Sequence, residues 1–193
     1  MKTILITGFE PFGGERVNPS WLAVEQLLER IGGFILHKLP LPTVFGQAPA
    51  ILLEKAKEIR PDYILSVGQA GGRDAVTPER IAVNIRDARI DDNAGNRPHG
   101  EFVAPEGPAA YFSTLPVEAM AQAIRDRNIP ATVSNSAGAF VCNDVMYSAL
   151  HAYAGTGVRC GFIHVPFLPS QGSPSLPLEQ TVAALIAAIE ILD

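Results

Sequence analysis

The sequence of 193 residues has few cysteines, no excess of positive charge and no long apolar run. Its two cysteines, Cys142 and Cys160, are too few for a disulfide scaffold or a zinc site built from cysteines, although one bridge between them stays possible. Lys and Arg number 15 against 20 Asp and Glu, and the formal net charge is -5. A nucleic-acid binder needs a basic face that displaces counterions from phosphates. Because no cluster of Lys or Arg is present, we expect no nucleic-acid partner.

The apolar runs are all far shorter than the roughly 20 residues that a transmembrane helix needs, so we expect no membrane segment. The N-terminal MKTILITGFEPFGG has only a short apolar run, and no small-residue cleavage site follows it. It therefore does not match the plan of a secretory signal peptide. We interpret the chain as a soluble, cytoplasmic protein, in which cysteines stay reduced.

The sequence does contain apolar strand patterns that alternate with amphipathic helix patterns. Strands are predicted at residues 4–7, 34–39, 63–67, 80–85, 132–134 and 158–165, and helices at 21–31, 48–59, 117–127, 140–153 and 178–189. This order predicts an α/β fold with a mostly parallel sheet and helices on both faces. The position of strand 80–85 in that sheet is left open. With no linker in the chain, we expect a single catalytic domain over residues 1–193.

Ligands bind beyond the carboxyl ends of the strands in such sheets, so residues just after strands are site candidates. The segment GFEPFGG at 8–14 lies where a phosphate-binding loop would lie, but Gly14 and Glu15 replace the required Lys and Ser or Thr. Its Phe9 and Phe12 indicate an apolar pocket, or else a plug at the end of the sheet.

Two other kinds of site are also not matched. The serine elbow G-x-S-x-G is absent, because Ser134 stands at the first Gly position. Four possible metal ligands in the long polar segment 87–108 fit no recognised spacing, and a solvated loop explains them better; they are Asp91, Asp92, His99 and Glu101. We therefore expect no metal. The length of segment 87–108 indicates a functional loop.

Cys142 follows a predicted strand and begins a predicted helix. The free N–H groups and partial positive charge of a helix N-terminus favour a thiolate, and they can also hold an oxyanion. The alternative is a buried cysteine that only packs. Cys160 lies inside the last strand, roughly 13 Å before its end at about 3.3 Å per residue, which suits packing.

His164 ends the last predicted strand and so lies at the same edge of the sheet as Cys142. A neutral imidazole there can deprotonate the thiol and later activate water. A Cys–His pair usually needs a third group that orients the imidazole, and Glu79 is a candidate. From the residues alone, however, a surface salt bridge with Arg80 is the preferred interpretation of Glu79. The remaining histidines fit structural roles; they are His37, His99 and His151.

Four blocks of the sequence together resemble the pyroglutamyl peptidase I family of cysteine peptidases, also called pyrrolidone carboxyl peptidases. The blocks are GFEPFGG with VNPS, GQAGGRDAVTPERIAVNIRDARIDDN, SNSAGAFVCNDVMYSALH and GFIHVPFLPSQ, and they run in family order from residue 8 to about 171. The resemblance implies an open three-layer α/β/α sandwich, no cofactor and a homotetramer. It also implies a cysteine exopeptidase that removes N-terminal pyroglutamyl residues from peptides.

The resemblance also assigns roles to individual residues. It implies that Cys142 is the nucleophile, His164 the base and Glu79 the orienting acid. Arg89 would be a cation near the nucleophile that lowers the thiol pKa or binds the oxyanion. The pyroglutamyl ring would be enclosed by Phe9, Phe12 and Phe140, and its amide would be bound by backbone groups around Gln69. Ser136 and Ala139 stand where Thr is common, which leaves the triad assignment intact.

Pyroglutamate is a compact neutral lactam, so aromatic walls favour its burial, while a charged N-terminus would lose its hydration there. Buried groups that pair with the lactam amide would reject rings that lack it. The expected reaction proceeds through a pyroglutamyl thioester on Cys142. Two alternatives are kept: an α/β phosphorylase-like enzyme, which needs a phosphate site, and a small-ligand binding module in which Cys142 only packs.

Overall fold

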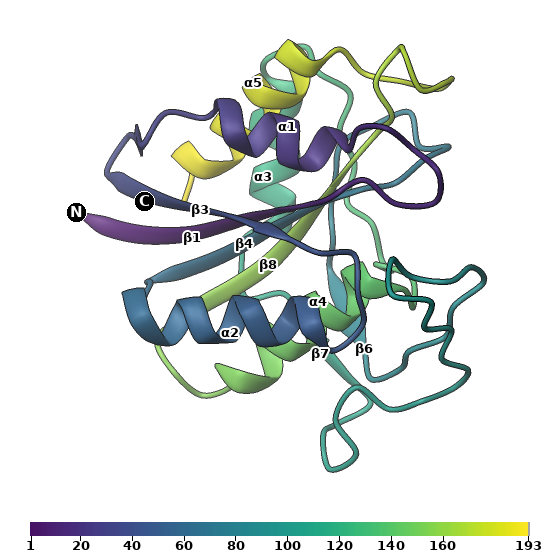
Figure 1. Ribbon diagram of the computed structural model, residues 1–193. Coiled ribbons are helices and arrows are strands. Elements are labelled where there is room, and N and C mark those ends of the chain that lie inside the picture. Colours follow the sequence, from purple (N-terminus) through teal and green to yellow (C-terminus); the bar gives the residue numbers. More distant parts are fainter. Residues whose placement is uncertain (193) are drawn as a thin grey trace.

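A computed structural model describes residues 1–192 and contains a central six-stranded sheet with the strand order β2-β3-β1-β4-β8-β5 (Figure 1). Its strands are β1 (Lys2–Phe9), β2 (Arg30–Ile31), β3 (Phe34–Leu41), β4 (Tyr63–Gln69), β5 (Thr77–Pro78) and β8 (Arg159–Val165). The four long strands β3, β1, β4 and β8 are parallel, and the short edge strands β2 and β5 are antiparallel to their neighbours. The prediction of a mostly parallel sheet is confirmed.

Helices cover both faces of the sheet (Figure 1). One face carries α1 (Pro19–Gln26), α3 (Val117–Arg125) and α5 (Leu178–Glu190), and the other carries α2 (Gln47–Ile59) and α4 (Val141–Ala152). Alternate side chains of β1 enter the two resulting cores: Ile4 and Ile6 pack on the α1 side and Leu5 on the α2 side, and all three are fully buried. The three-layer α/β/α sandwich is therefore confirmed.

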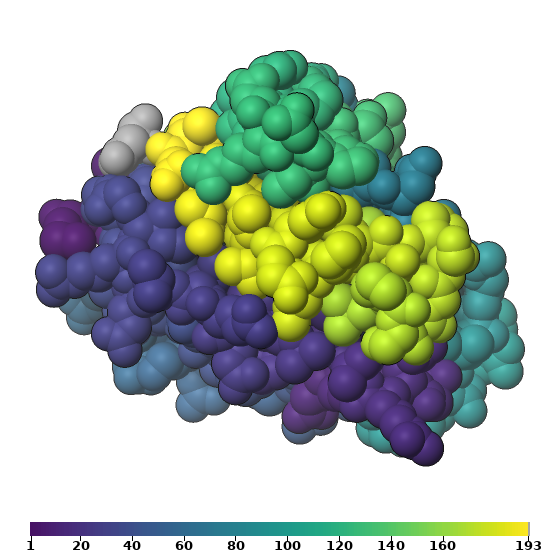
Figure 2. Space-filling model, turned by 90° about the horizontal axis from the view of Figure 1, so that it is seen from above, coloured from purple at the N-terminus to yellow at the C-terminus, as the bar shows by residue number. Residues whose placement is uncertain are grey.

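The layer formed by α1, α3 and α5 is seen from outside in Figure 2. The C-terminal segment, in yellow, lies between the green segment that contains α3 and the purple N-terminal segment that contains α1. The last helix thus holds together two parts of this layer that are far apart in the sequence. Among residues 1–192, no helix is long and apolar enough to cross a membrane.

The first helix is shorter than predicted. It ends at Gln26, and the predicted continuation to residue 31 is wrong, because Arg30 and Ile31 form β2 and pair with the start of β3. Gly32 and Gly33 join the two strands, and Gly32 has a φ of 55°. A pair of glycines is a favoured two-residue hairpin loop as well as a helix stop, and here it acts as the hairpin loop.

The strand predicted at 132–134 is also wrong, and Pro78 explains why. The segment lies parallel to residues 76–80 and makes backbone hydrogen bonds on both sides of Pro78: Thr132 N–H to Val76 O, and Ser134 N–H to Pro78 O. In a regular parallel ladder, the hydrogen bond between these two would be donated by the backbone N–H of residue 78. Proline has no N–H, so this bond is missing. The segment therefore forms only isolated bridges, at Ala131 and Ser134.

Strand 80–85 is confirmed as β6 (Ile81–Val83), but it lies outside the main sheet and pairs with β7 (Ala110–Phe112) in a separate two-stranded sheet. The chain between β6 and β7 has no helix or strand, as expected for the long polar segment. All other predicted elements agree with the structure to within two residues at each end. The expected single domain over 1–193 includes Asp193, which lies outside the described residues.

Candidate active site

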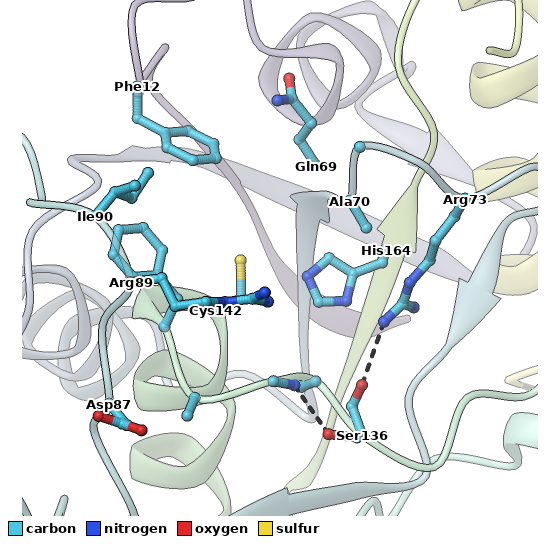
Figure 3. Close-up of a pocket in the computed structure, with 15 residues that line it drawn as sticks. Phe12, Gln69, Ala70, Arg73, Asp87, Arg89, Ile90, Ser136, Cys142 and His164 are labelled. Atoms are coloured by element: carbon cyan, nitrogen blue, oxygen red, sulfur yellow. Dashed lines mark hydrogen bonds between the residues drawn. The ribbon is translucent and has the colours of Figure 1, made fainter. Parts of the chain in front are cut away.

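A cavity of about 720 Å³ opens at the carboxyl ends of β4 and β8, where α4 begins (Figure 3). Its walls come from five separate parts of the chain, and the lining residues are Phe12, Gln69, Ala70, Gly71, Arg73, Asp87, Arg89, Ile90, Ser136, Ala137, Gly138, Ala139, Phe140, Cys142 and His164. This is the edge of the sheet at which ligands bind in open α/β folds. The cavity therefore contains most of the residues that the sequence singled out.

Cys142 is the second residue of α4, and its two successors anchor this end of the helix. The side chain of Asn143 accepts the N–H of Val83 at 2.9 Å and donates to the Val83 carbonyl at 2.8 Å. Asp144 is fully buried and forms an ion pair with Arg86 at 2.9 Å. These bonds attach the first turn of α4 to the chain around β6, so the backbone at Cys142 is held in place.

The sulfur of Cys142 lies directly against β4. A Cβ atom built on Gly68 would lie 2.8 Å from Cys142 Sγ, so only the absence of a side chain at residue 68 leaves room for the thiol. Gly68 is the register partner of His164 across β4 and β8. The thiol and the imidazole therefore come from neighbouring positions, and Figure 3 shows both directed into the same cavity.

The Cys142 thiol is only partly exposed, and burial raises its pKa to about 12. The negative charge of Glu79 raises the pKa further, while the positive charge of Arg73 lowers it. The backbone hydrogen bond at Cys142, in the first turn of α4, lowers the pKa as expected, but burial and Glu79 outweigh it, so the expectation that the helix N-terminus keeps this thiol ionised is not met. A neutral resting thiol needs a base that removes its proton as it attacks.

His164 is placed in the cavity beside Cys142, where a base would lie. It is 4% exposed, and its Nδ1 lies 2.7 Å from Oε1 of Glu79. Burial lowers the pKa of His164 and keeps the imidazole neutral, although Glu79 acts in the opposite direction. Since an ionised carboxylate only accepts hydrogen bonds, Nδ1 carries the proton and Nε2 is left as the acceptor.

Glu79 is fully buried and lies next to His164 because its backbone N–H donates to the carbonyl of Phe162 on β8 at 2.9 Å. Burial by itself would raise the pKa of Glu79. The hydrogen bond and charge of His164, the nearby side chain of Ser134 and the charge of Arg73 together outweigh this effect and lower it. Glu79 is therefore ionised at neutral pH.

The interpretation of Glu79 as a surface partner of Arg80 is wrong. Arg80 instead forms an exposed ion pair with Glu118 at 2.5 Å. The ion-pair partner of Glu79 is Arg73, whose Nη1 lies 2.6 Å from Oε1. Successive residues of an extended segment point to opposite sides, which separates Arg80 from its neighbour and turns Glu79 into the protein.

Two of the three predicted aromatic residues line the cavity. The rings of Phe12 and Phe140 are 5.9 Å apart between centroids, and Phe45 packs edge-on behind Phe140 at 5.1 Å. Phe9 does not line the cavity; it is 2% exposed and packs in the core against Phe162. The apolar wall is therefore formed by Phe12 and Phe140.

Gln69 and Arg89 are both in the cavity wall. Gln69 ends β4, and its Oε1 accepts a hydrogen bond from Nε2 of Gln171 at 3.0 Å. The side-chain NH₂ group of Gln69 takes no part in this bond. Arg89 is exposed, and in Figure 3 its side chain extends across the cavity in the direction of Cys142.

The first backbone N–H groups of the loop at residues 8–14 are not free to bind a phosphate. The N–H of Phe9 donates to Ser20 Oγ at 3.0 Å, and the N–H of Glu10 donates to the carbonyl of Leu41 at 2.9 Å. Backbone N–H groups that are already bonded within the protein cannot hold a phosphate. This loop instead places Phe12 in the cavity.

Asp92, an acidic residue of the long polar segment, has a structural role. Asp92 accepts the N–H groups of Ala94 at 2.9 Å and Asn96 at 2.8 Å, so it closes its own turn. It also accepts the N–H of Phe45 at 2.9 Å and thereby fixes the loop behind the aromatic wall. Within residues 1–192, no group of three or more His, Cys, Asp and Glu side chains is placed to hold a metal ion.

Sequence reasoning missed Arg73 and Gln171. Arg73 forms the ion pair with Glu79, and Gln171 bonds to Gln69 and to Glu15. Both residues follow the carboxyl end of a strand, which is the position that marks site candidates in this fold. That positional rule was the available signal, but it does not tell which of several loop residues will point inward.

Comparison with known proteins identifies the family. The family model described as pyroglutamyl peptidase matches residues 2–193. The pyrrolidone-carboxylate peptidase of Chromobacterium violaceum is 53% identical over 197 residues, covering 99% of this chain and 92% of that protein. The relative of the same name from Escherichia fergusonii is 52% identical over 98% of this chain and 92% of its own length.

Solved structures agree. Pyroglutamyl peptidase I of Bacillus amyloliquefaciens superposes with a TM-score of 0.95 at 44% identity, covering 100% of this chain and 97% of that chain. Pyrrolidone carboxyl peptidase from Thermococcus litoralis gives a TM-score of 0.95 at 40% identity, with coverage of 100% and 93%. Similarity of this extent over the whole length establishes common membership. The chain therefore belongs to the pyroglutamyl peptidase family and is an enzyme of that class.

Proposed function

We propose that this chain removes N-terminal pyroglutamyl residues from peptides by using Cys142, His164 and Glu79 as a single catalytic unit. One observation carries the proposal: a buried His164 is bonded to an ionised Glu79 at 2.7 Å in the cavity that also contains the Cys142 thiol. A nucleophile, a base and a group that orients the base are the three parts that acyl transfer requires.

The reaction begins with a neutral thiol and a neutral imidazole. As Cys142 Sγ bonds to the pyroglutamyl carbonyl carbon, Nε2 of His164 takes the thiol proton. The C–N bond of the peptide then breaks, and His164 returns the proton to the leaving amine. The products of this half-reaction are the shortened peptide and a pyroglutamyl thioester on Cys142.

Water completes the cycle. His164 takes a proton from a water molecule as its oxygen bonds to the thioester carbonyl carbon. The C–S bond breaks, pyroglutamate leaves and the sulfur regains a proton from His164. Glu79 holds the imidazole in the tautomer needed for both halves of the reaction and offsets its positive charge while it carries the extra proton.

Each tetrahedral intermediate carries a negative oxygen that needs donors. The first turn of α4 supplies unpaired backbone N–H groups beside Cys142, because the first residues of a helix have no partner within it. Arg89 supplies a positive charge from the cavity wall, and its side chain extends toward Cys142 in Figure 3. We propose that it stabilises this developing negative charge.

Selectivity for pyroglutamate comes from the aromatic wall. Phe12 and Phe140 favour a flat neutral ring over a charged N-terminus, which would lose its hydration there. Gln69 supplies amide groups for the lactam, so that a ring without the lactam amide leaves polar groups unpaired. We further propose that the enzyme acts in the cytoplasm as a homotetramer, each chain forming one catalytic domain over residues 1–193.

Hydrolysis of a fluorogenic pyroglutamyl amide tests the proposal, with the two cysteines as a matched pair. Cys142→Ser should abolish turnover, whereas Cys160→Ser should retain it, because Cys160 is buried in β8 with its sulfur 3.8 Å from the Ala149 carbonyl. An inactive wild type, or equal loss in folded forms of both variants, would contradict the proposed function.

A further inference from the structure

A second arginine in the cavity, Arg73, is bonded directly to the catalytic carboxylate. Its Nη1 donates to Glu79 Oε1 at 2.6 Å and also to the hydroxyl of Thr77. Its Nη2 donates to the carbonyl of Ser136 at 3.2 Å. One guanidinium thus joins the turn after β4, the segment that carries Glu79 and the loop that leads to Cys142. In Figure 3 it lies on the far side of His164 from Cys142.

Glu79 depends on this contact because it has few other partners. Its Oε1 accepts from both His164 and Arg73, while Oε2 is buried without a hydrogen-bond partner in the described part of the chain. A carboxylate that has lost its water is costly unless an opposite charge is near. The guanidinium of Arg73 supplies that charge without occupying the oxygen lone pair that His164 uses.

The charge of Arg73 also acts on the proton of the Glu79–His164 pair, in the same direction as burial, which has the larger effect on His164. An ionised Glu79 with no other partner would favour a positively charged His164, and a charged imidazole cannot take the proton of a thiol. With Arg73 in place, Glu79 is already neutralised. His164 can then stay neutral until Cys142 attacks.

We propose that Arg73 is a positioning residue of the catalytic unit, which holds Glu79 ionised and oriented so that His164 rests as a neutral base. The proposal rests on the proposed function and deepens it. It separates the two arginines of the cavity by role: Arg73 acts through Glu79 and His164, whereas Arg89 is exposed and faces the substrate space.

The charged and titratable groups around His164 define the pH test. They are Glu79 after β5, Arg73 after β4, Cys142 on α4 and Arg89 in the cavity wall. The positive charge of Arg73 lowers the pKa of His164. Replacing Arg73 by Gln therefore raises the pKa of His164 and moves the acid limb of the reaction to higher pH.

Two measurements test this on the full-length enzyme. In the first, kcat and KM for a pyroglutamyl amide are compared for wild type, Arg73→Lys and Arg73→Gln. We expect kcat of Arg73→Gln to fall about 10- to 100-fold, as for loss of one hydrogen bond to a charged group, with little change in KM. Arg73→Lys should recover part of this loss, since it keeps the charge but not the paired donors.

The second measurement needs no substrate. The rate at which iodoacetamide alkylates Cys142 is followed against pH, and its acid limb should lie at higher pH in Arg73→Gln than in wild type. Because Arg73 lines the open cavity, a low concentration of guanidinium ion should partly restore the rate in Arg73→Ala. Arg80→Gln is the matched control, because Arg80 pairs with the exposed Glu118 and should leave both profiles unchanged.

The outcomes separate the two proposals. A wild type that does not cleave the pyroglutamyl amide overturns the proposed function, whatever the alkylation profiles are. An active wild type, with Arg73→Lys and Arg73→Gln that keep its kcat and acid limb, overturns the role of Arg73 alone. If Arg73→Gln does not fold, as judged by circular dichroism, the milder Arg73→Lys decides by its kcat: because that variant lacks the paired donors, a wild-type kcat rejects the proposal.

Discussion

Gly68 and Cys142 lie so close that a Cβ atom on residue 68 would be 2.8 Å from Cys142 Sγ. The same Cβ atom would also be 2.7 Å from the ring of Phe162. Both neighbours are packed, so neither can move away without disturbing the core. The absence of a side chain at residue 68 is therefore a requirement of the site.

Gly68→Ala should accordingly damage both stability and activity. We expect an overpacking cost of about 1–3 kcal/mol and a fall in kcat/KM of at least about tenfold, since a sulfur displaced by a fraction of an ångström loses its approach to the carbonyl. Urea denaturation and the amide assay measure the two effects. Gly157→Ala is the control, because a Cβ atom there has no neighbour within 4 Å.

Glu79→Gln keeps the shape of the side chain but removes its charge. By analogy with the loss of charge in catalytic triads, we expect kcat to fall about 10²- to 10⁴-fold. Steady-state kinetics and a thermal melt on the same samples distinguish this from unfolding. The matched variant Glu118→Gln removes an exposed carboxylate that pairs with Arg80, and it should leave kcat unchanged. Wild-type turnover in Glu79→Gln would reduce Glu79 to a structural residue.

The buried His164 should make stability depend on pH. Burial lowers its pKa in the folded state, whereas the unfolded chain takes up a proton near the ordinary value of about 6.5. The unfolded state thus binds more protons, and the free energy of unfolding should fall as pH drops from about 7 to 5.5. Glu79, with its lowered pKa, acts in the same direction below about pH 4.5.

The variant His164→Gln isolates this contribution, because glutamine takes up no proton in this range. Urea denaturation of both proteins at about pH 7 and 5.5 should show a larger loss of stability in the wild type. An equal loss in both would mean that His164 does not titrate differently in the folded and unfolded states.

Gln171 should affect substrate binding more than chemistry. Its Nε2 lies 3.0 Å from Gln69 Oε1 and 3.2 Å from both Glu15 Oε2 and the Val17 carbonyl, so it connects the end of β4 to the loop that carries Phe12. Without these bonds both walls of the pocket are less well held.

We therefore expect Gln171→Ala to raise KM several-fold with a smaller change in kcat. Gln122→Ala is a suitable comparison, since the Gln122 side chain bonds to exposed neighbours at the C-terminal end of α3, namely Arg125 and the C-cap Asp126. A fall in kcat at constant KM would indicate that Gln171 acts on the catalytic unit instead.

Much of the fold was predictable because long apolar strands and amphipathic helices carry strong periodic signals. The wrong predictions have local causes that the periodic pattern does not reveal. Gly32 and Gly33 suit a helix stop and a hairpin loop alike, and the choice depends on whether β3 is beside them. Residues 132–134 have strand character, but Pro78 on the opposite segment removes the bond they need.

Some residues of the candidate site could be identified from the sequence, and others could not. Cys142 and His164 could be selected from their positions at the ends of predicted elements, without any knowledge of a partner. Glu79 could not, because its choice of Arg73 over the adjacent Arg80 depends on which side of an extended segment is buried. Phe9 was misjudged for the same reason, as its ring turns into the core while Phe12 turns toward the cavity.

The high pKa of the Cys142 thiol has a consequence for the lifetime of the enzyme. Peroxides oxidise thiolates to sulfenic acids far more readily than they oxidise protonated thiols. A sulfur that gives up its proton only when a carbonyl is beside it is therefore a poor target for oxidants between turnovers. By this argument, the burial that raises the thiol pKa should also slow oxidation of Cys142 while no substrate is bound.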